Sequence, residues 1–364
     1  MNNSTSKYAQ AGVDAIKENY ALEHMSKWIK KSFALRKNDI GSIKLDVGYF
    51  ANLIDIGYNI GLTVSTDGVG TKILIAQMMH KYDTIGIDCV AMNVNDVICL
   101  GAEPIALLDY IAVQSPNANL LEEITKGLYR GAEIAKVSIP GGEISQMSEV
   151  VKGVRKDYGF DLVGTCIGIV SLDKAIIGES INKNDTIVGL GSDGIHSNGL
   201  TLAREIFFKK MKFKPDKYFN ELNRTIGEEL LQPTHIYVPE IMEMVKSGLN
   251  IKALINITGD GFMNLTRVAS PVSYVIDYLP EPQPIFTLLQ NYGNVAEEEM
   301  YWVYNMGIGF CVILPEDEAE SAINIAKKYS VNAYKIGHVI KGKEKEVDIK
   351  PKRLLGKGNR FYKY

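Results

Sequence analysis

The stretch "IGLTVSTDGVGTKILIAQMM", residues 60–79, predicts a strand, a polar turn and a helix in direct succession. Alternating apolar residues indicate a strand over 60–64, and apolar spacing indicates a helix over 72–79. The turn "STDGVGTK", residues 65–72, places a carboxylate, two glycines, hydroxyl groups and an ammonium group within eight residues. A strand that passes through such a turn into a helix is typical of α/β folds.

Strands and amphipathic helices continue to alternate along the chain, which predicts an α/β (α+β) fold of two domains. We expect strands at 105–113, 160–170, 185–191 and 306–314, and helices at 84–101, 121–135, 200–210 and 316–329. We also expect a loop at 138–145 and a solvated basic tail at 350–364. The chain of 364 residues exceeds a typical single core. The charged, turn-rich stretch 171–184 is the expected boundary, so the predicted domains are 1–170 and 171–364.

The bulk composition argues against several classes of protein. A net charge of −3, from 40 basic and 43 acidic residues, gives no basic excess for a nucleic-acid partner. We find no apolar run long enough to span a bilayer, and the first residues are too polar for a signal peptide, so we expect a cytoplasmic protein without a membrane partner. The cysteines lack paired spacing and lie among apolar neighbours, which predicts buried free thiols. They are Cys89, Cys99, Cys166 and Cys311.

The turn at 65–72 carries the groups that bind a polyphosphate together with its metal ion. A carboxylate such as Asp67 at the end of a strand is a common ligand of Mg²⁺, which prefers oxygen donors and shares them with phosphates. Gly68 and Gly70 let the backbone approach an anion closely. Thr71 adds a hydroxyl group, and Lys72 adds a mobile positive charge. The spacing does not fit the GxxxxGK[ST] phosphate loop, and an ordinary polar turn is the alternative interpretation.

The helix at 84–101 carries polar side chains on the face opposite its apolar stripe. Asp88 and Asn95 lie two turns apart there, with Asp96 beside them. A solvated helix face is the alternative interpretation, but this helix is otherwise apolar and contains no lysine. Buried carboxylates need a partner, and one metal ion can serve two of them. Asp67 and Asp96 are therefore the candidate magnesium ligands.

Further candidate ligands lie in loops of both halves. The motif "GGE" at 141–143 adds a carboxylate behind two glycines, and Asp161 opens the strand at 160–170. The turn "GSDGIHSNG", residues 191–199, connects a strand to a helix, and its polar side chains and free amides can bind a phosphate. His196 lies in this turn among small residues that leave it little core to join. A structural histidine is the alternative, and we favour a functional role.

These motifs together resemble the aminoimidazole ribonucleotide synthetase family, also called phosphoribosylformylglycinamidine cyclo-ligases, of purine biosynthesis. The resemblance runs almost end to end, and the motifs follow the family's order. They are "YAQAGVD" at 8–14, "STDGVGTK", "DTIGIDCVAMNVNDVICLGAEP", "GGE", "DLVG", "SDGIHSNG", "LQPTHIYV" and "YNMGIGF". Selenophosphate synthetase and thiamine-phosphate kinase share the Asp-rich ATP site, but we do not expect them to keep "YAQAGVD", "SNGL" and "PTHIYV" at these places.

The resemblance implies a two-domain α/β fold whose N-terminal sheets pair across a homodimer, with the active site near that interface. It implies ATP, Mg²⁺ and formylglycinamidine ribonucleotide as ligands, and aminoimidazole ribonucleotide, ADP and phosphate as products. The catalytic candidates are His196, Lys72 and Asp67. The candidates for binding ATP or substrate are Asp14, Gly68, Gly70, Thr71, Asn95, Gly141, Gly142, Glu143, Asp161, Ser197 and Asn198. The candidate metal ligands are Asp67 and Asp96.

Two loops depart from the family's usual pattern. The chain has "NITGDG" at 256–261 in place of "HITGGG", so Asn256 cannot titrate and Asp260 brings negative charge to a loop that can face phosphate. It also has "GGEISQMSE" at 141–149 in place of "GGETAEMPG". Two other functions stay open. One is a related enzyme that transfers phosphoryl groups from ATP to another small molecule, and the other is a dimeric ligand-binding protein without turnover.

Overall fold

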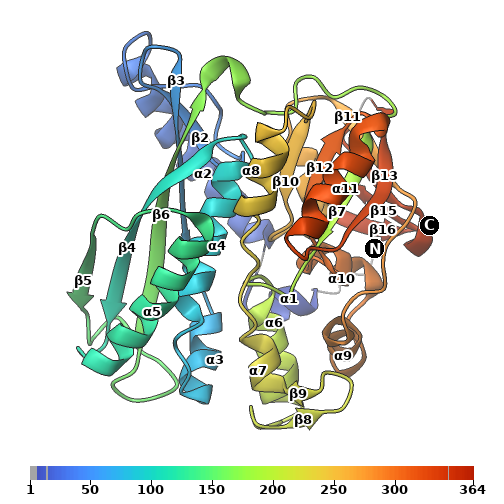
Figure 1. The fold of residues 1–364 in the computed structure, drawn as a ribbon. Coiled ribbons are helices and arrows are strands. Elements are labelled where there is room, and N and C mark those ends of the chain that lie inside the picture. Colours follow the sequence, from blue (N-terminus) through green and yellow to red (C-terminus); the bar gives the residue numbers. More distant parts are fainter. Residues whose placement is uncertain (1–5, 14, 343) are drawn as a thin grey trace.

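The computed structural model describes residues 6–13, 15–342 and 344–364 and contains two large β-sheets with helices packed between them (Figure 1). The elements of the first half are α1 (Lys7–Gln10), α2 (Ala15–Phe33), β1 (Ser42–Ile43), β2 (Asn52–Asp55), β3 (Ile60–Gly68), α3 (Lys72–Met79), α4 (Ile85–Ile98), β4 (Glu103–Val113), α5 (Ala118–Ala135), β5 (Gly142–Gln146) and β6 (Phe160–Ser171). The elements of the second half are β7 (Thr186–Gly191), α6 (Leu200–Arg204), β8 (Tyr218–Phe219), β9 (Arg224–Thr225), α7 (Ile226–Leu230), α8 (Val238–Lys246), β10 (Ala253–Asn256), β11 (Val272–Ile276), α9 (Pro284–Gly293), α10 (Glu297–Val303), β12 (Ile308–Leu314), α11 (Ala319–Lys328), β13 (Ala333–Lys341), β14 (Val347–Ile349), β15 (Leu354–Lys357) and β16 (Arg360–Lys363).

The first sheet has six strands in the order β1-β2-β3-β6-β4-β5. Neighbouring strands are antiparallel, except that β4 and β5 run parallel. Helix α4 packs against β3 and β6 on one face, where side chains such as Thr63 and Cys166 are fully buried. The other face carries exposed apolar side chains, so the sheet has apolar groups on both faces. These are Ile60, Leu108, Tyr110 and Ile169.

Helix α4 occupies the centre of the molecule. Its apolar stripe includes Val90, Val94 and Val97, which are fully buried, as the predicted helical spacing requires. Gly86 allows α4 to lie directly on α5, because a Cβ at this position would stand only 2.1 Å from the backbone nitrogen of Leu128. The helix is therefore fixed on both sides, by the sheet and by α5, and it can hold polar side chains in defined positions.

The second sheet has eight strands in the order β10-β12-β7-β13-β11-β14-β15-β16. Its neighbours are antiparallel except β11 and β14, which run parallel. Helix α11 packs on β7 and β13, and α8 packs on α11. Because α8 also contacts α4 and α5, helices from both halves form the layer between the two sheets.

The strands and helices predicted from apolar periodicity are present, and the structure differs at three places. The predicted tail at 350–364 is instead the hairpin β15–β16 at the edge of the second sheet. Leu354 and Phe361 are buried there, and Gly358 turns the chain with φ 61°. Because residues 350–364 include many lysines and arginines, the short apolar pattern of these two strands could not be recognised in the sequence. The predicted loop at 138–145 contains β5, and the predicted helix at 200–210 is α6 followed by a π-helical turn.

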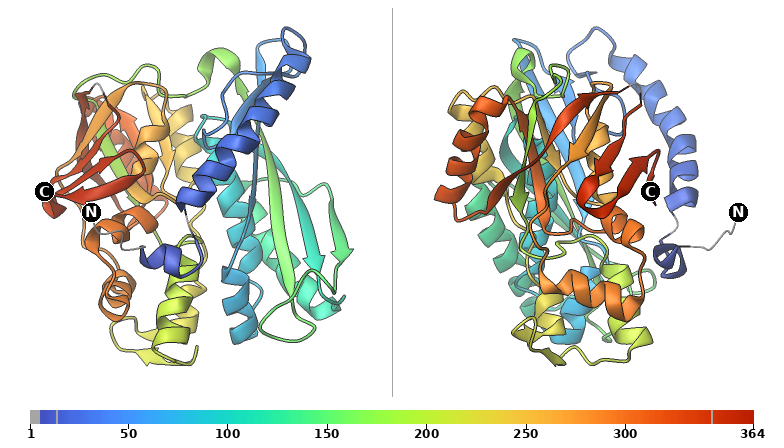
Figure 2. Two further views of the ribbon diagram at one scale, coloured as in Figure 1. Left: turned by 180° about the vertical axis from the view of Figure 1, so that it is seen from behind. Right: turned by 90° about the vertical axis from the view of Figure 1, so that its right-hand side faces the viewer.

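Two further observations concern the surface and the thiols. Helix α2 stands on the outside of the molecule, and most of its described side chains are exposed (Figure 2). All four cysteines are buried and free, as predicted. Within the described residues, no helix has both the length and the apolar character that a membrane span requires.

Candidate functional site

The predicted metal ligands Asp67 and Asp96 lie where the end of β3 meets α4. The backbone N–H of Asp67 donates to Asn93 Oδ1 on α4 at 2.9 Å, which ties the strand to the helix. Burial raises the pKa of Asp96 to about 7; a hydrogen bond from Asn256 opposes this, and the charge of Asp67 adds to it. Burial also raises the pKa of Asp67. Two neighbouring carboxylates that both resist ionisation form a pair that a cation would stabilise.

The residues that depart from the family pattern, Asn256 and Asp260, both have defined partners. Asn256 ends β10, and its Nδ2 donates to Asp96 Oδ1 at 2.8 Å, so it contacts a predicted metal ligand directly. Asp260 has a left-handed backbone with φ 72°, and its carboxylate lies 3.0 Å from Arg267 Nη2. The negative charge expected on this loop is therefore partly neutralised by Arg267.

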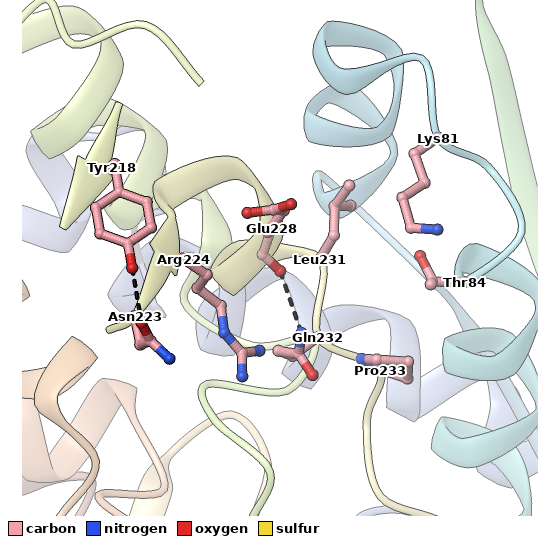
Figure 3. A pocket seen from close by; sticks show the side chains of 9 residues that line it. All are labelled: Lys81, Thr84, Tyr218, Asn223, Arg224, Glu228, Leu231, Gln232 and Pro233. Carbon is pink, nitrogen blue, oxygen red and sulfur yellow. Dashed lines mark hydrogen bonds between the residues drawn. The ribbon is translucent and has the colours of Figure 1, made fainter. Parts of the chain in front are cut away.

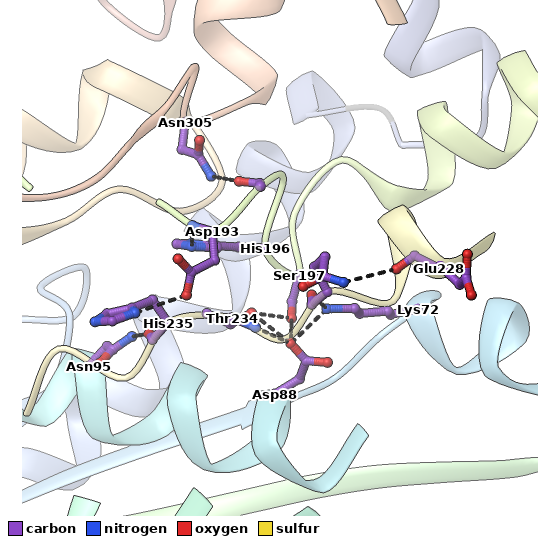
Figure 4. A network of polar contacts seen from close by, with 12 residues as sticks. Lys72, Asp88, Asn95, Asp193, His196, Ser197, Glu228, Thr234, His235 and Asn305 are labelled. Atoms are coloured by element: carbon purple, nitrogen blue, oxygen red, sulfur yellow. Dashed lines mark hydrogen bonds and ion pairs between the residues drawn. The ribbon is translucent and has the colours of Figure 1, made fainter. Parts of the chain in front are cut away.

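Lys72 and Asp88 form a fully buried ion pair with 2.8 Å between Nζ and Oδ1 (Figure 4). The expectation of a mobile Lys72 is therefore wrong, because its ammonium group is fixed by Asp88 and by the carbonyl of Gln232 at 2.5 Å. The same Asp88 oxygen accepts from Ser197 Oγ at 3.1 Å, from the Thr234 N–H at 2.7 Å and from the Thr234 hydroxyl at 2.8 Å. One buried oxygen thus joins segments from both halves of the chain. The catalytic role of Lys72 stays a prediction.

His196 adopts a left-handed backbone with φ 58° in the turn at 192–199. It is only 4% exposed and packs against Tyr237 and against Gly309, where a Cβ would stand 2.6 Å from His196 Cε1. The expectation that His196 has little core to join is therefore wrong. The backbone N–H of Asp193 donates to His196 Nε2 at 3.3 Å, and burial lowers the pKa of His196 to about 3, so the ring is neutral. Its catalytic role stays a prediction.

Other predicted residues bring the turn at 65–72 close to the second half. The hydroxyl oxygens of Thr71 and Thr201 lie 3.0 Å apart. Asn198 lies beside the loop at 256–261, since a Cβ on Gly259 would stand 3.7 Å from Asn198 Oδ1. Gly70 has φ 68°, and a Cβ there would meet no heavy atom within 4 Å, so the backbone at this glycine faces open space. Gly68 is the last residue of β3.

Asn95 connects α4 to the segment at 235–237. Its Nδ2 donates to the carbonyl of His235 at 2.8 Å, and its Oδ1 accepts the N–H of Tyr237 at 2.9 Å. The ring nitrogens of His235 each lie 2.9 Å from a carboxylate oxygen, one of Asp193 and one of Glu240. Because both nitrogens face acceptors, both carry protons and the ring is an imidazolium. Burial opposes this charge, but the two hydrogen bonds outweigh it and raise the pKa of His235 to about 9.

The structure does not bring Glu143 and Asp161 to Asp67 within one chain. Glu143 pairs with Tyr110, and Asp161 pairs with Ala112, so both belong to the open face of the first sheet, whereas Asp67 faces α4. Gly141 precedes β5 and Gly142 begins it. Asp14 lies outside the described residues. The roles of all these residues stay predictions.

Several residues that the structure places at the site are not among the candidates predicted from the sequence. Asp109 stands opposite Gly164 in the sheet, as Asp67 does on the other side, so both carboxylates flank one strand on the face toward α4. A lone carboxylate inside the apolar run 105–113 was the available signal. Thr234 and His235 lie in the motif "LQPTHIYV", but the sequence assigned them no role, because their partners on α4 and in the turn are far away in sequence.

A pocket of about 650 Å³ lies next to the Lys72–Asp88 ion pair, between the two halves (Figure 3). Gln232 lines it and also binds Lys72 through its carbonyl oxygen. The other lining residues are Lys81, Thr84, Tyr218, Asn223, Arg224, Glu228, Leu231 and Pro233. None of the residues predicted to bind nucleotide lines this pocket.

Two family models match the chain. They are described as "AIR synthase related protein, N-terminal domain", over residues 49–170, and "AIR synthase related protein, C-terminal domain", over residues 182–350. A Methanocaldococcus jannaschii protein named phosphoribosylformylglycinamidine cyclo-ligase is 43% identical over 354 residues, which cover 96% of this chain and 95% of the relative. The chain belongs to the phosphoribosylformylglycinamidine cyclo-ligase family. A relative of the same name from Pyrococcus furiosus is 44% identical over 332 residues, covering 91% of this chain and 94% of the relative.

Solved structures support the fold of this cyclo-ligase family member. Thiamine-monophosphate kinase from Stenotrophomonas maltophilia superimposes with a TM-score of 0.61 at 18% identity, covering 87% of this chain and 95% of the kinase. The hydrogenase maturation protein HypE in complex with ATP gives a TM-score of 0.57 at 18% identity, with 80% and 82% covered. These identities are low, so the likeness shows the fold alone, and it confirms the predicted two-part α/β architecture.

Proposed function

We propose that this protein catalyses the ATP-dependent cyclisation of formylglycinamidine ribonucleotide to 5-aminoimidazole ribonucleotide, with ADP and phosphate as the other products. The observation that carries the proposal is the 43% identity to a relative of that name across 96% of the chain. The hydrogen bonds around Asp88 agree with it, because they bring the motifs of both halves to one place.

The chemistry needs an activated oxygen, because the oxygen of a formyl amide is a poor leaving group. In the proposed reaction this oxygen attacks the γ-phosphorus of ATP and ADP departs. An amidine nitrogen of the same molecule then attacks the formyl carbon that bears the phosphorylated oxygen. Phosphate leaves from this carbon, and loss of a proton completes the imidazole ring. Positioning and charge neutralisation dominate the first step. Holding the nitrogen beside the carbon makes the second step unimolecular.

The chain's own groups suit the placement of phosphates. The open backbone at Gly70 gives an anion room to approach the main chain between β3 and α3. Lys72 is the last residue of this turn, and its positive charge is fixed in the ion pair with Asp88. His196 is neutral and its Nε2 accepts the N–H of Asp193, so its Nδ1 can donate one hydrogen bond but the ring cannot supply a permanent charge.

We infer that Mg²⁺ accompanies the nucleotide and is held by Asp67 and Asp96. Among the described residues, no three His, Cys, Asp or Glu side chains are grouped closely enough to hold a metal ion alone. Two carboxylates still fit Mg²⁺, which takes one or two protein carboxylates and completes its shell with phosphate oxygens and water. The charge of Asp67, which adds to the raised pKa of Asp96, supports this donor pair. When bound, the ion would neutralise charge on the phosphates.

The purified protein is expected to form an imidazole amine from formylglycinamidine ribonucleotide and MgATP, with one ADP released per ring closed. Removing divalent cations with EDTA should abolish both products, and added Mg²⁺ should restore them. ADP formation only with other small-molecule acceptors would instead favour the related phosphoryl-transfer function. Nucleotide binding without any ADP formation would favour the non-catalytic hypothesis.

We also propose that the protein forms a homodimer through the open face of its first sheet. Leu108 and Tyr110 are 39% and 37% exposed there, on a face that otherwise leaves a row of apolar side chains in water. Glu143 and Asp161 lie on the same face, which would bring them to the subunit interface.

We further propose domain limits at 1–170 and 171–364. We also propose a cytoplasmic location, where ATP and the phosphorylated substrate are available.

Leu108→Glu is expected to convert the dimer to monomers, because it places a charge in the apolar face. Light scattering coupled to gel filtration measures the mass directly. Ile134→Glu is the matched control, because Ile134 is 46% exposed on α5, away from this face. A Leu108→Glu variant that keeps the dimeric mass would remove this face from the interface.

A further inference from the structure

We propose that His235 is a positioning residue, which holds the turn at 192–199 through Asp193 as a cation fixed between two carboxylates. The kinetic part of this proposal rests on the proposed function, and its structural part does not. His235 belongs to the motif "LQPTHIYV", which assigned it no role, and its hydrogen-bond partners are Asn95, Asp193 and Glu240 rather than the predicted metal ligands.

Asp193 connects His235 to His196 by two different groups. Its carboxylate accepts from His235 Nδ1 at 2.9 Å, while its backbone N–H donates to His196 Nε2 at 3.3 Å (Figure 4). A displacement of the Asp193 side chain therefore moves the hydrogen-bond donor that orients the His196 ring. His235 acts on His196 through this single intervening residue.

His235 is itself held firmly, which a positioning residue requires. Its carbonyl accepts from Asn95 on α4 at 2.8 Å, and the neighbouring Tyr237 is bound to the same amide. Its second ring nitrogen donates to Glu240, which is 1% exposed in the first turn of α8. A carboxylate as buried as that of Glu240 needs a cationic partner, and His235 supplies it.

The turn needs such a restraint because its backbone is unusual. His196 has φ 58° and Gly194 has φ 135°, and a left-handed non-glycine residue persists only where its surroundings hold it. On the opposite side, Asn305 donates to the carbonyl of Gly194 at 2.9 Å and accepts from Ser192 Oγ at 3.0 Å. These bonds are neutral, whereas the contact with His235 is charge-assisted and therefore stronger.

The charged and titratable groups that face His235 are Asp193, Glu240 and His196, and the ring of Tyr237 lies 4.6 Å away between centroids. The pKa of His235 in the fold, about 9, is above its ordinary value of 6.5. The ion pairs therefore contribute fully below pH 6.5 and are lost as the pH rises through 9. His196 stays neutral across this range.

The kinetic test compares Asp193→Asn, His235→Gln and the double variant, each in the full-length enzyme. Each single change is expected to lower kcat by about 10- to 100-fold with little change in KM for ATP, because a small misplacement of a site group has an effect of this size. The double variant should lose no more than the worse single variant, since both act through one contact. His235→Arg, which keeps a cation between the carboxylates, should restore most of kcat.

Two variants separate positioning from loss of folding. His235→Gln leaves the Glu240 carboxylate buried without a cation, so His235→Gln/Glu240→Gln removes that charge as well and should show the same kcat loss with a wild-type melting temperature. His338→Gln is the matched control, because His338 lies 2.7 Å from Asp277 in another histidine–carboxylate pair, on β13. It should leave kcat unchanged. Independent losses in Asp193→Asn and His235→Gln, or full activity in His235→Gln, would overturn the proposal.

A spectroscopic readout does not depend on activity. The chain has five histidines, so their ring nitrogens can be assigned by ¹⁵N NMR. The wild-type protein should show one histidine that stays cationic to about pH 9, and His235→Gln and Asp193→Asn should both shift the ring signals of His196. Unmoved His196 signals would overturn the positioning role. A wild-type enzyme without cyclisation activity would overturn the proposed function and leave this result to stand by itself.

Discussion

Asp67→Asn is expected to lower kcat by about 10²- to 10³-fold, the effect of removing one group that stabilises charge during the reaction. Asparagine keeps the shape of the side chain and can still accept the N–H of Gly68, so the turn itself is preserved. What it removes is half of the carboxylate pair with Asp96. MgATP binding, measured by calorimetry, should weaken together with kcat.

The stability of Asp67→Asn separates a functional carboxylate from a structural one. Burial raises the pKa of both Asp67 and Asp96, so ionising them weakens the fold. Stability therefore falls as the pH rises from their pKa values in the unfolded chain through the higher pKa values in the fold. Removing one charge should therefore leave the melting temperature equal or higher. MgATP should raise the melting temperature of the wild type and not of the variant. Asp55→Asn is the control, because Asp55, on the neighbouring strand β2, pairs with Lys44, and the change should alter kcat little. A variant that loses stability and activity in equal measure would support the structural interpretation.

Lys72→Met is expected to reduce the free energy of unfolding by about 3–5 kcal/mol, because it leaves the Asp88 carboxylate buried without its cation. Burial lowers the pKa of Lys72 and Asp88 opposes this, as in a pair whose members depend on one another. Chemical denaturation followed by circular dichroism measures the change. Adding Asp88→Asn should recover part of the loss, since the double variant contains no unpaired buried charge.

Lys81→Met is the matched control for Lys72→Met. Lys81 also pairs with an aspartate, Asp83, at 2.8 Å, but its side chain is 47% exposed. A pair so open to solvent contributes less than about 1 kcal/mol. Equal losses in the two variants would mean that burial does not set the strength of the Lys72 pair.

Local periodicity was sufficient to predict most of the fold. The stripe of Val90, Val94 and Val97 indicated α4, and the apolar runs indicated the central strands of both sheets. Apolar periodicity did not predict the hairpin at the C-terminus, because β15 and β16 are short and rich in lysine and arginine. Their pairing is stabilised by the sheet edge that they join, and that edge is not a local property of residues 350–364.

The site was predictable only in part, for a physical reason. The functional groups of a turn such as "STDGVGTK" stand next to one another in the sequence and can be recognised there. The contact between Asp88 and Thr234, in contrast, joins residues 146 positions apart. The burial of His196 depends on Gly309, which makes room for its ring from a strand much later in the chain. The ionic state of His235 depends in the same way on Asp193 and Glu240. Such long-range partners follow from topology, which single-sequence patterns do not contain.

The four hydrogen bonds on one Asp88 oxygen limit how this molecule can move. Lys72 belongs to the first half and Ser197 and Thr234 to the second, so hinge opening between the halves would expose a desolvated charge and break several strong bonds at once. We therefore expect ligands to exchange by rearrangement of peripheral loops around a rigid centre. Crystal structures of successive ligand states should superimpose closely along α4 and differ in the loops around it.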